Sequence, residues 1–243
     1  LKIKSNQRAI TNMPFSYSYM FSIINTFIEV GASILVTNNS IMQKEFWKEF
    51  HQNKITSLSG VPYIFEMLIK LGLKNLLNPY LKNFTQAGGK LDKNSTQKIV
   101  NFCKKNNLKF ISMYGQTEAS PRMTYLNWKN ITKKIGSIGK AIPYTEIWLE
   151  NNNGGIIKKA NQVGELVFRG KNVSMGYSYN INDLKKGDKN KGLLKTGDLA
   201  YFDTQGYFYI TGRKNRISKV FGNRINLDEL ERKMKTNKIE IAC

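Results

Sequence analysis

The chain has 243 residues, a formal net charge of +21 at pH 7, and 41% hydrophobic and 12% aromatic residues. This length and apolar content suit one large domain or two small ones and exclude an intrinsically disordered chain. The most apolar stretch, 15–37, is interrupted by polar residues and a central Glu29, which argues against a membrane-spanning helix. Cys103 and Cys243 are too few for a disulfide framework, so we expect a cytoplasmic protein.

The positive charge raises the alternative of a nucleic-acid-binding protein, because basic patches displace counterions from phosphates. The lysines are spread over nearly every segment, however, and no five or six basic residues run together. A generally basic surface explains this distribution better. We therefore expect no nucleic-acid partner and keep nucleic-acid binding as the less favoured alternative.

In the first half of the chain, short apolar runs alternate with helical patterns. Strands are predicted at 33–37, 55–58, 84–86 and 108–114, and helices at 43–50, 62–71 and 95–106. Strands separated by helices indicate a parallel sheet with crossover connections. We therefore predict an α/β fold and assign residues 1–134 to the α/β part of a large domain.

Beyond about residue 135, many glycines separate short β-rich segments such as TEIWLE, GELVFRG and GYFYITG. Hairpin-like turns are expected at 152–155 and 203–206. This pattern predicts an antiparallel, barrel-like unit over 135–212. The chain then becomes basic again, and a helical pattern at 227–235 predicts the start of a small α+β carboxyl-terminal domain over 213–243.

Two segments at predicted strand ends carry candidate site residues. Ligands gather beyond the carboxyl ends of parallel strands, and Thr117 and Glu118 follow the strand that ends at Tyr114. A threonine hydroxyl there suits a phosphate oxygen and a glutamate suits Mg²⁺, although both residues also suit the start of a helix. Gly88 and Gly89 follow another strand and permit close approach of a ligand, or form a plain turn.

A third segment runs from Lys195 to Glu231. Asp198 follows a Thr-Gly turn, where its carboxylate suits the two hydroxyls of a ribose. Arg213 ends another predicted strand and suits the same ligand through its forked guanidinium group. Asp198 as a turn residue and Arg213 as a solvated charge are the alternatives.

Four segments occur in a characteristic order and with characteristic spacing: MYGQTE, GELVFRGKNVSMGYSYN, LLKTGDLAYFDTQGYFYITGR and GRKNRISKVFGNRINLDELE. With them, the chain resembles the adenylate-forming superfamily of acyl-CoA synthetases, peptide-synthetase adenylation domains and luciferase-type ligases. MPFSYSYMFS and QAGGKL also fit this resemblance, which covers nearly the whole chain.

The resemblance implies a role for each candidate residue. Tyr114 would stack on adenine, Gly88 and Gly89 would line the adenine and acyl pocket, Thr117 would contact the α-phosphate, and Glu118 would bind Mg²⁺. Asp198 and Arg213 would hold the ribose, Asn215 would be the hinge of the small carboxyl-terminal domain, and Lys219 and Arg224 would be basic positions beyond it.

The implied reaction activates a small carboxylic acid with ATP as an acyl-adenylate and then transfers the acyl group to a thiol. The implied cofactors are ATP and Mg²⁺. The acceptor would be coenzyme A (CoA) or a carrier protein bearing phosphopantetheine. The sequence features do not distinguish between these two acceptors.

The chain departs from the pattern of the superfamily in several places. The phosphate loop ending in Pro-Lys and the distal lysine of the carboxyl-terminal domain are missing, so we expect an inactive fragment lacking both ends. A non-catalytic nucleotide-binding module is the alternative. Tyr17 and Met20 replace the usual His and Gly, and Asn215 replaces the usual Asp or Lys. His51 is the single histidine, which argues against a zinc site or a Ser-His-Asp triad.

Overall fold

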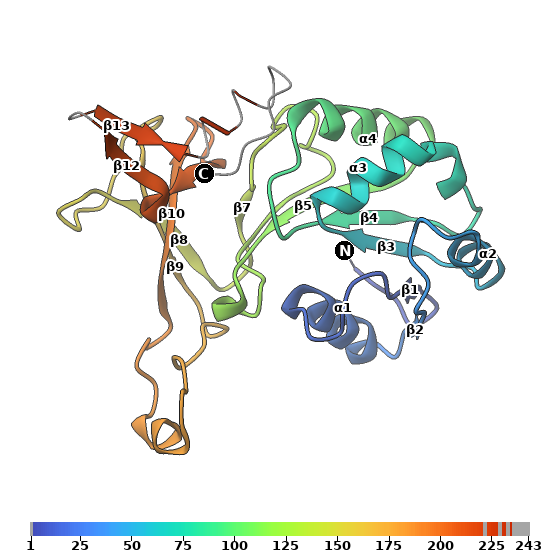
Figure 1. Cartoon of the computed structure of the whole chain (residues 1–243), viewed down its shortest axis with the longest axis horizontal. Helices are drawn as coiled ribbons and strands as arrows, with labels where there is room; N and C mark the ends of the chain where they lie inside the picture. Colours follow the sequence, from blue (N-terminus) through green and yellow to red (C-terminus); the bar gives the residue numbers. More distant parts are fainter. Residues whose placement is uncertain (1, 221–222, 228–229, 232–233, 235–243) are drawn as a thin grey trace. The chain divides into compact units, whose positions relative to one another are not determined.

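A computed structural model describes residues 2–220, 223–227, 230, 231 and 234 (Figure 1). The chain forms two compact units, Leu1–Gly139 and Lys140–Cys243. The predicted division into 1–134, 135–212 and 213–243 stays a prediction. No helix within the described residues is both long and apolar enough to cross a membrane.

The first unit is built on a sheet whose strands lie in the order β2-β1-β3-β4-β5-β6. The strands are β1 (Arg8–Ile10), β2 (Ser33–Leu35), β3 (Ser57–Gly60), β4 (Asn83–Gln86), β5 (Lys109–Tyr114) and β6 (Thr124–Leu126). Strands β1 to β5 pair in parallel, and β6 pairs antiparallel to β5. This pairing confirms the predicted parallel sheet. The two-residue strand β7 (Lys140–Ala141) stands where the second unit begins.

Helices connect the parallel strands, as predicted. They are α1 (Ser18–Glu29), α2 (Lys44–Gln52), α3 (Pro62–Leu71) and α4 (Lys93–Lys105), with short 3-10 helices η1 (Leu73–Leu76) and η2 (Thr117–Ala119). Helix α3 has the predicted bounds, because Pro62 fits the first helical turn and Gly72 follows the last. The sequence analysis did not predict β1 or α1. Helix α1 buries Tyr19, Met20, Ile23 and Phe27, which recur at helical spacing. Polar residues lie between them and interrupt the apolar stretch of the sequence.

The two faces of the sheet are covered by different helices (Figure 1). On one face, Phe65 of α3 packs against Phe84 of β4 and Phe110 of β5, with ring centroids 6.3 Å and 5.4 Å away. On the other face, α1 joins a core that includes Ile111 and Met113 of β5. Successive side chains of a strand alternate between faces, so β5 contributes to both cores. The strands are thereby fixed with their carboxyl ends at one edge.

The second unit contains an antiparallel sheet in the order β11-β10-β9-β8. Its strands are β8 (Glu146–Glu150), β9 (Gly164–Arg169), β10 (Leu193–Phe202) and β11 (Phe208–Arg213). An antiparallel pair of strands, β12 (Ile217–Val220) and β13 (Asn223–Asn226), follows. The Asn151 side chain closes the turn at 152–155, accepting from Gly155 N at 2.8 Å, and Asp203 closes the turn at 203–206. Both predicted turns and the antiparallel pairing are confirmed. The order of the four described strands is open, with β11 and β8 at its edges, so the described residues do not show the barrel-like closure that was predicted. The predicted helix at 227–235 falls largely outside the described residues.

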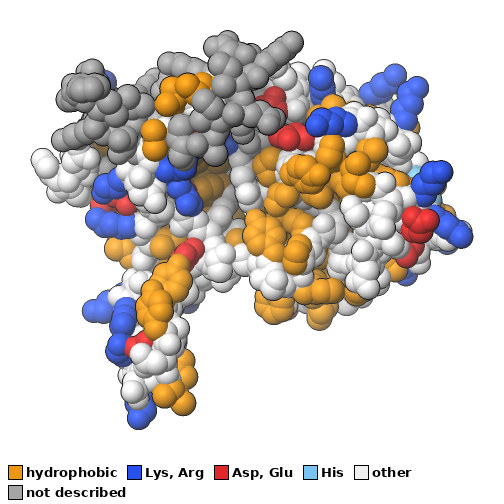
Figure 2. Space-filling view, viewed as in Figure 1, with side chains coloured by type: hydrophobic (Ala, Val, Ile, Leu, Met, Phe, Trp, Pro, Cys, Tyr) orange, Lys and Arg blue, Asp and Glu red, His pale blue; other side chains and the backbone are white. Residues whose placement is uncertain are grey.

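The loop between β9 and β10 extends away from the sheet and carries η3 (Ile181–Lys186). Its large hydrophobic side chains are exposed: Met175, Tyr177, Tyr179, Ile181 and Leu184. Figure 2 shows hydrophobic side chains along this loop, and Lys and Arg side chains scattered over the visible face rather than gathered in one patch. The scattered cations agree with the generally basic surface that the sequence predicts.

Candidate functional site

The carboxyl ends of β3, β4 and β5 lie together at one edge of the parallel sheet. The register pairs Gly60 of β3 with Gln86 of β4, and Gln86 with Ser112 of β5. The loops that follow β4 and β5 therefore leave the sheet side by side. These loops carry Gly88 and Gly89 after β4, and Thr117 and Glu118 after β5.

The loop after β4 is held by the buried side chain of Gln86. Its Nε2 donates to the carbonyl oxygen of Gly89 at 2.8 Å and to that of Ala87 at 3.3 Å. Gly88 has a φ of +76°, which favours glycine, and a Cβ there would collide with the Tyr17 hydroxyl. Glycine at position 88 thus suits both the backbone conformation and the nearby Tyr17 side chain, and the plain turn and the ligand contact stay alternatives.

The loop after β5 is tight for a similar reason. A Cβ on Gly115 would collide with the carbonyl group of Pro121, because the backbone doubles back on itself here. The loop closes where Met123 N donates to the Tyr114 carbonyl oxygen at 3.1 Å. Between these points, η2 presents an exposed Thr117 and a half-buried Glu118, while Tyr114 ends the strand half-buried.

Thr117 also contacts the start of α1. The Ser18 and Thr117 hydroxyl oxygens lie 2.8 Å apart, and Ser18 is the first residue of that helix. The amino end of a helix carries partial positive charge and unpaired N–H groups, which favour a bound anion. This arrangement gives the Thr117 hydroxyl an environment suited to a phosphate oxygen.

Glu118 is a chemically suitable Mg²⁺ ligand. Mg²⁺ is commonly bound through one or two carboxylates, with water and substrate phosphate oxygens completing its octahedral shell. Among the described residues, no three His, Cys, Asp or Glu side chains are grouped so that they could hold a metal ion. Glu118 therefore fits a shared site in which a nucleotide supplies other oxygens, and does not fit an all-protein metal cage.

In the second unit, Asp198 of β10 and Arg213 of β11 are register partners. Arg213 Nε donates to Asp198 Oδ1 at 2.8 Å. The Asp198 side chain is 6% exposed and that of Arg213 is 54% exposed. The structure thus brings together the two residues predicted to hold one ligand. The Asp198 side chain is buried, and the Arg213 side chain is exposed to solvent.

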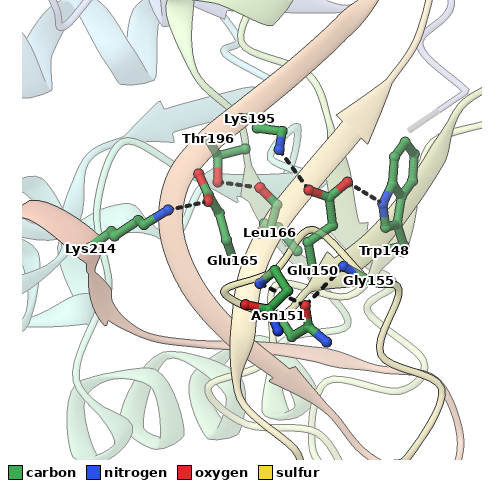
Figure 3. Close-up of polar contacts among 10 residues, drawn as sticks. Trp148, Glu150, Asn151, Gly155, Glu165, Leu166, Lys195, Thr196 and Lys214 are labelled. Atoms are coloured by element: carbon green, nitrogen blue, oxygen red, sulfur yellow. Dashed lines mark hydrogen bonds and ion pairs between the residues drawn. The ribbon is translucent and has the colours of Figure 1, made fainter.

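A local irregularity in β10 positions Asp198. The pairing of β10 with β9 shifts register between Lys195 and Leu199, and Gly197 has a φ of +70°. Thr196 bridges this irregularity. Its hydroxyl donates to the Leu166 carbonyl oxygen at 2.7 Å (Figure 3). The same hydroxyl accepts from Asp198 N at 3.0 Å. Such a bulge re-aims a side chain at a defined point of a sheet.

Two ion pairs flank this part of the sheet (Figure 3). Lys195 Nζ lies 2.8 Å from Glu150 Oε2, and Lys214 Nζ lies 2.8 Å from Glu165 Oε2. The hydrogen bond from Lys195 lowers the pKa of Glu150, and the same bond raises the pKa of Lys195.

The predicted hinge residue Asn215 is exposed within η4 (Lys214–Arg216). Lys219 and Arg224 are register partners in the backbone of β12 and β13, and their side chains lie outside the described part of the structure.

The sequence analysis missed two residues of the site. Ser18 belongs to a helix that was not predicted, so its contact with Thr117 had no sequence signal. Gln86 does have a sequence signal, because a glutamine at the end of a buried strand needs a hydrogen-bond partner. The roles assigned to the site residues remain predictions.

Comparison with known proteins gives concordant results. A family model described as "AMP-binding enzyme" matches residues 1–178. The chain is 28% identical over 210 residues to oxalate–CoA ligase of Saccharomyces cerevisiae, covering 86% of this chain and 37% of that protein. It is 27% identical over 232 residues to 2-succinylbenzoate–CoA ligase of Oceanobacillus iheyensis, covering 95% and 46%.

A solved structure of O-succinylbenzoate coenzyme A synthetase from Bacillus subtilis, in complex with ATP and magnesium ion, has the same fold. The TM-score is 0.81 at 21% identity, over 98% of this chain and 48% of that one. The chain thus spans less than half the length of these relatives.

Proposed function

This chain belongs to the AMP-binding enzyme family, and from this premise we propose that it contributes the nucleotide site of a carboxylic acid–CoA ligase. In the proposed reaction, the carboxylate oxygen attacks the α-phosphorus of ATP, and an acyl-adenylate forms as pyrophosphate leaves. The CoA thiol then attacks the acyl carbon, a thioester forms, and AMP leaves. The ligase and acyl-CoA synthetase character of the relatives supports this proposal.

The observation that carries the proposal is the arrangement at the carboxyl edge of the parallel sheet. Thr117 lies beside the amino end of α1, where a phosphate oxygen would accept a hydrogen bond and gain from the helix dipole. Gly88 and Gly89 are exposed in the loop after β4, and the proposal places the adenine ring or the acyl group against their backbone. Bound Mg²⁺ would neutralise phosphate charge, and Glu118 would be its protein ligand.

The second unit supports the ribose assignment. The Asp198 carboxylate is held by Arg213 and aimed by the bulge in β10, so it is fixed before a ligand binds. A fixed carboxylate accepts two vicinal hydroxyls with little loss of side-chain freedom. Charge builds on phosphate oxygens during the attack, so positioning by such groups would supply much of the catalysis.

We propose CoA as the thiol acceptor, because the two curated relatives described above are CoA ligases. A carrier protein bearing phosphopantetheine is the competing acceptor, and product analysis separates the two. The acid is proposed to be a small carboxylic acid. Oxalate, 2-succinylbenzoate, 4-hydroxybutyrate and medium-chain acids form the first panel, since the relatives are named for them.

The test is acid-dependent exchange of labelled pyrophosphate into ATP, measured with the polypeptide that carries this chain. We expect exchange with at least one acid, and at least a tenfold loss in the Thr117→Ala variant. Thr204→Ala, in an exposed turn, is the control and should keep the exchange rate. Nucleotide binding without exchange for any acid would instead favour a non-catalytic nucleotide-binding module.

A further inference from the structure

The opposite edge of the parallel sheet holds a second polar feature. A hollow of about 410 Å³ lies at the amino ends of the strands, where Arg8 begins β1, Ser33 begins β2, and Thr56 and Lys82 directly precede β3 and β4. Gly88 and Thr117 follow the carboxyl ends of strands in the same sheet. The hollow is therefore separate from the proposed nucleotide site.

The hollow is strongly basic. Arg8, Lys54 and Lys82 line it, and none of its lining residues is a carboxylate. Within the described residues, none of these three cations takes part in an ion pair. Like charges around one hollow repel one another, and a bound anion would relieve that repulsion.

Arg8 is fixed in position before any ligand arrives. Its Nε donates to Ser33 Oγ at 2.9 Å, and its Nη1 donates to the Asn53 carbonyl oxygen at 2.9 Å. Its backbone is tied to Thr56, whose hydroxyl accepts from Arg8 N at 2.8 Å. In the part of the chain that the structure describes, Nη2 makes no hydrogen bond. A guanidinium group held in this way loses little entropy on binding a phosphate.

Lys54 and Tyr80 form the other wall of the hollow. Lys54 has a φ of +54°, a conformation that non-glycine residues seldom adopt, at the turn between α2 and β3. Its Nζ lies 5.4 Å from the centre of the Tyr80 ring, which is a cation–π distance. The ammonium group is thus also placed by the fold, and an aromatic ring stands beside it.

We propose that this hollow binds the diphosphate group of a small phosphorylated molecule. Three cations match the two to four negative charges of a diphosphate, and the volume falls within the range of small-molecule sites. The Nη2 group of the fixed Arg8 contacts one phosphate, and Lys54 and Lys82 contact the other. This site lies at the edge of the sheet opposite Gly88 and Thr117. The proposed acid–CoA ligase reaction requires no ligand there.

Calorimetric titration of the full chain with inorganic pyrophosphate tests the proposal. The double variant Lys54→Glu/Lys82→Glu should bind at least tenfold more weakly. The control, Lys74→Glu/Lys98→Glu, makes the same charge change at a different hollow of the same unit and should stay within twofold. Equal losses in the two double variants would show a general charge effect and overturn the proposal.

Two further measurements sharpen the test. Lys54→Ala/Lys82→Ala, with an unchanged circular dichroism spectrum, should also lose affinity, which separates binding from misfolding. The Thr117→Ala background should leave the loss of pyrophosphate affinity caused by Lys54→Ala/Lys82→Ala unchanged, so that failure of the proposed catalytic site remains distinguishable. Unaltered pyrophosphate affinity in both Lys54/Lys82 variants would overturn the proposal.

Discussion

The hydroxyl oxygens of Ser18 and Thr117 lie 2.8 Å apart, although 99 residues separate them in the sequence. This contact links the amino end of α1 to the loop after β5. It places the hydroxyl predicted to contact a phosphate next to the positive end of a helix. The first unit therefore combines two features that each favour an anion.

We predict that Ser18→Ala lowers the kcat/KM of pyrophosphate exchange about two- to tenfold, because a neutral hydrogen bond contributes roughly 0.5–1.5 kcal/mol. Thr117→Ala should lower it further, since both the phosphate contact and the Ser18 contact are lost. Thr117→Ser keeps the hydroxyl and should retain most of the activity. An active Thr117→Ala enzyme beside an inactive Thr117→Ser enzyme would contradict the assigned role.

The second prediction concerns the contact between Gly88 and Tyr17. Gly88→Ala adds a Cβ at a φ of +76° and drives it into the Tyr17 hydroxyl. We expect the melting temperature to fall by about 4 °C or more, as a loss of roughly 2 kcal/mol implies. The measurement is calorimetric unfolding of the polypeptide that carries this chain.

Two variants separate the collision from the backbone strain. Gly31→Ala has a φ of +66° with no atom within 4 Å of the new Cβ, so it should show strain alone and a smaller loss. Tyr17→Phe/Gly88→Ala removes the colliding hydroxyl and should recover part of the stability. If Gly31→Ala costs as much as Gly88→Ala, the Tyr17 contact contributes nothing.

Much of the parallel sheet could be predicted from the sequence, because its helices and strands have clear periodicities. Helix α3 begins at a proline and ends before a glycine, and its bounds were predicted without error. Helix α1 was missed, because polar residues that it exposes interrupt the apolar run. A buried face with helical spacing is visible in that segment only once its packing partners are known.

Site residues could be predicted from the sequence where a residue of that type has few structural roles at that position. Asp198 and Arg213 were predicted to share a ligand, and the antiparallel register places them as partners. The sequence had no means of finding the bond from Thr196 to Leu166, because it depends on a bulge in the pairing of β10 with β9. Bulges depend on cross-strand register, which local patterns do not encode.

The third prediction concerns Cys103 on α4. The side chain is buried, and burial raises the pKa of its thiol to about 12. Since only the thiolate reacts, alkylation at pH 8.5 should be more than about a hundredfold slower in the native state than in denaturant. The measurement uses a Cys243→Ser background so that one thiol is followed.

The raised pKa of Cys103 also fixes the direction of a pH effect on stability. The unfolded thiol has a pKa of about 8.5, so its contribution to stability is complete below that pH. The contribution is lost as the pH rises from about 8.5 toward the folded value of about 12. Cys103→Ala should remove this component of the alkaline decline, and an unchanged decline would contradict the assignment.

The last prediction concerns Asp198, whose carboxylate accepts from Arg213 at 2.8 Å. If it also takes the two ribose hydroxyls, Asp198→Asn and Asp198→Ala should each lower nucleotide affinity at least tenfold. Charge-assisted hydrogen bonds contribute roughly 1.5–3 kcal/mol each, and about 1.4 kcal/mol corresponds to one decade. The measurements are ATP affinity and melting temperature on the same variants.

A matched control comes from the neighbouring ion pair. Glu165→Gln removes the carboxylate charge that faces Lys214 at 2.8 Å in the same sheet, and it should change stability slightly while leaving ATP affinity intact. Deoxy-ATP gives a second check, because removing one ribose hydroxyl should weaken binding to the unmodified protein more than to Asp198→Ala. If Asp198 only stabilises the turn and its bond to Arg213, its substitutions should lower the melting temperature. They should then change the affinities for ATP and deoxy-ATP by the same factor. That result would place the ribose elsewhere, since a carboxylate that contacts both hydroxyls must distinguish the two nucleotides.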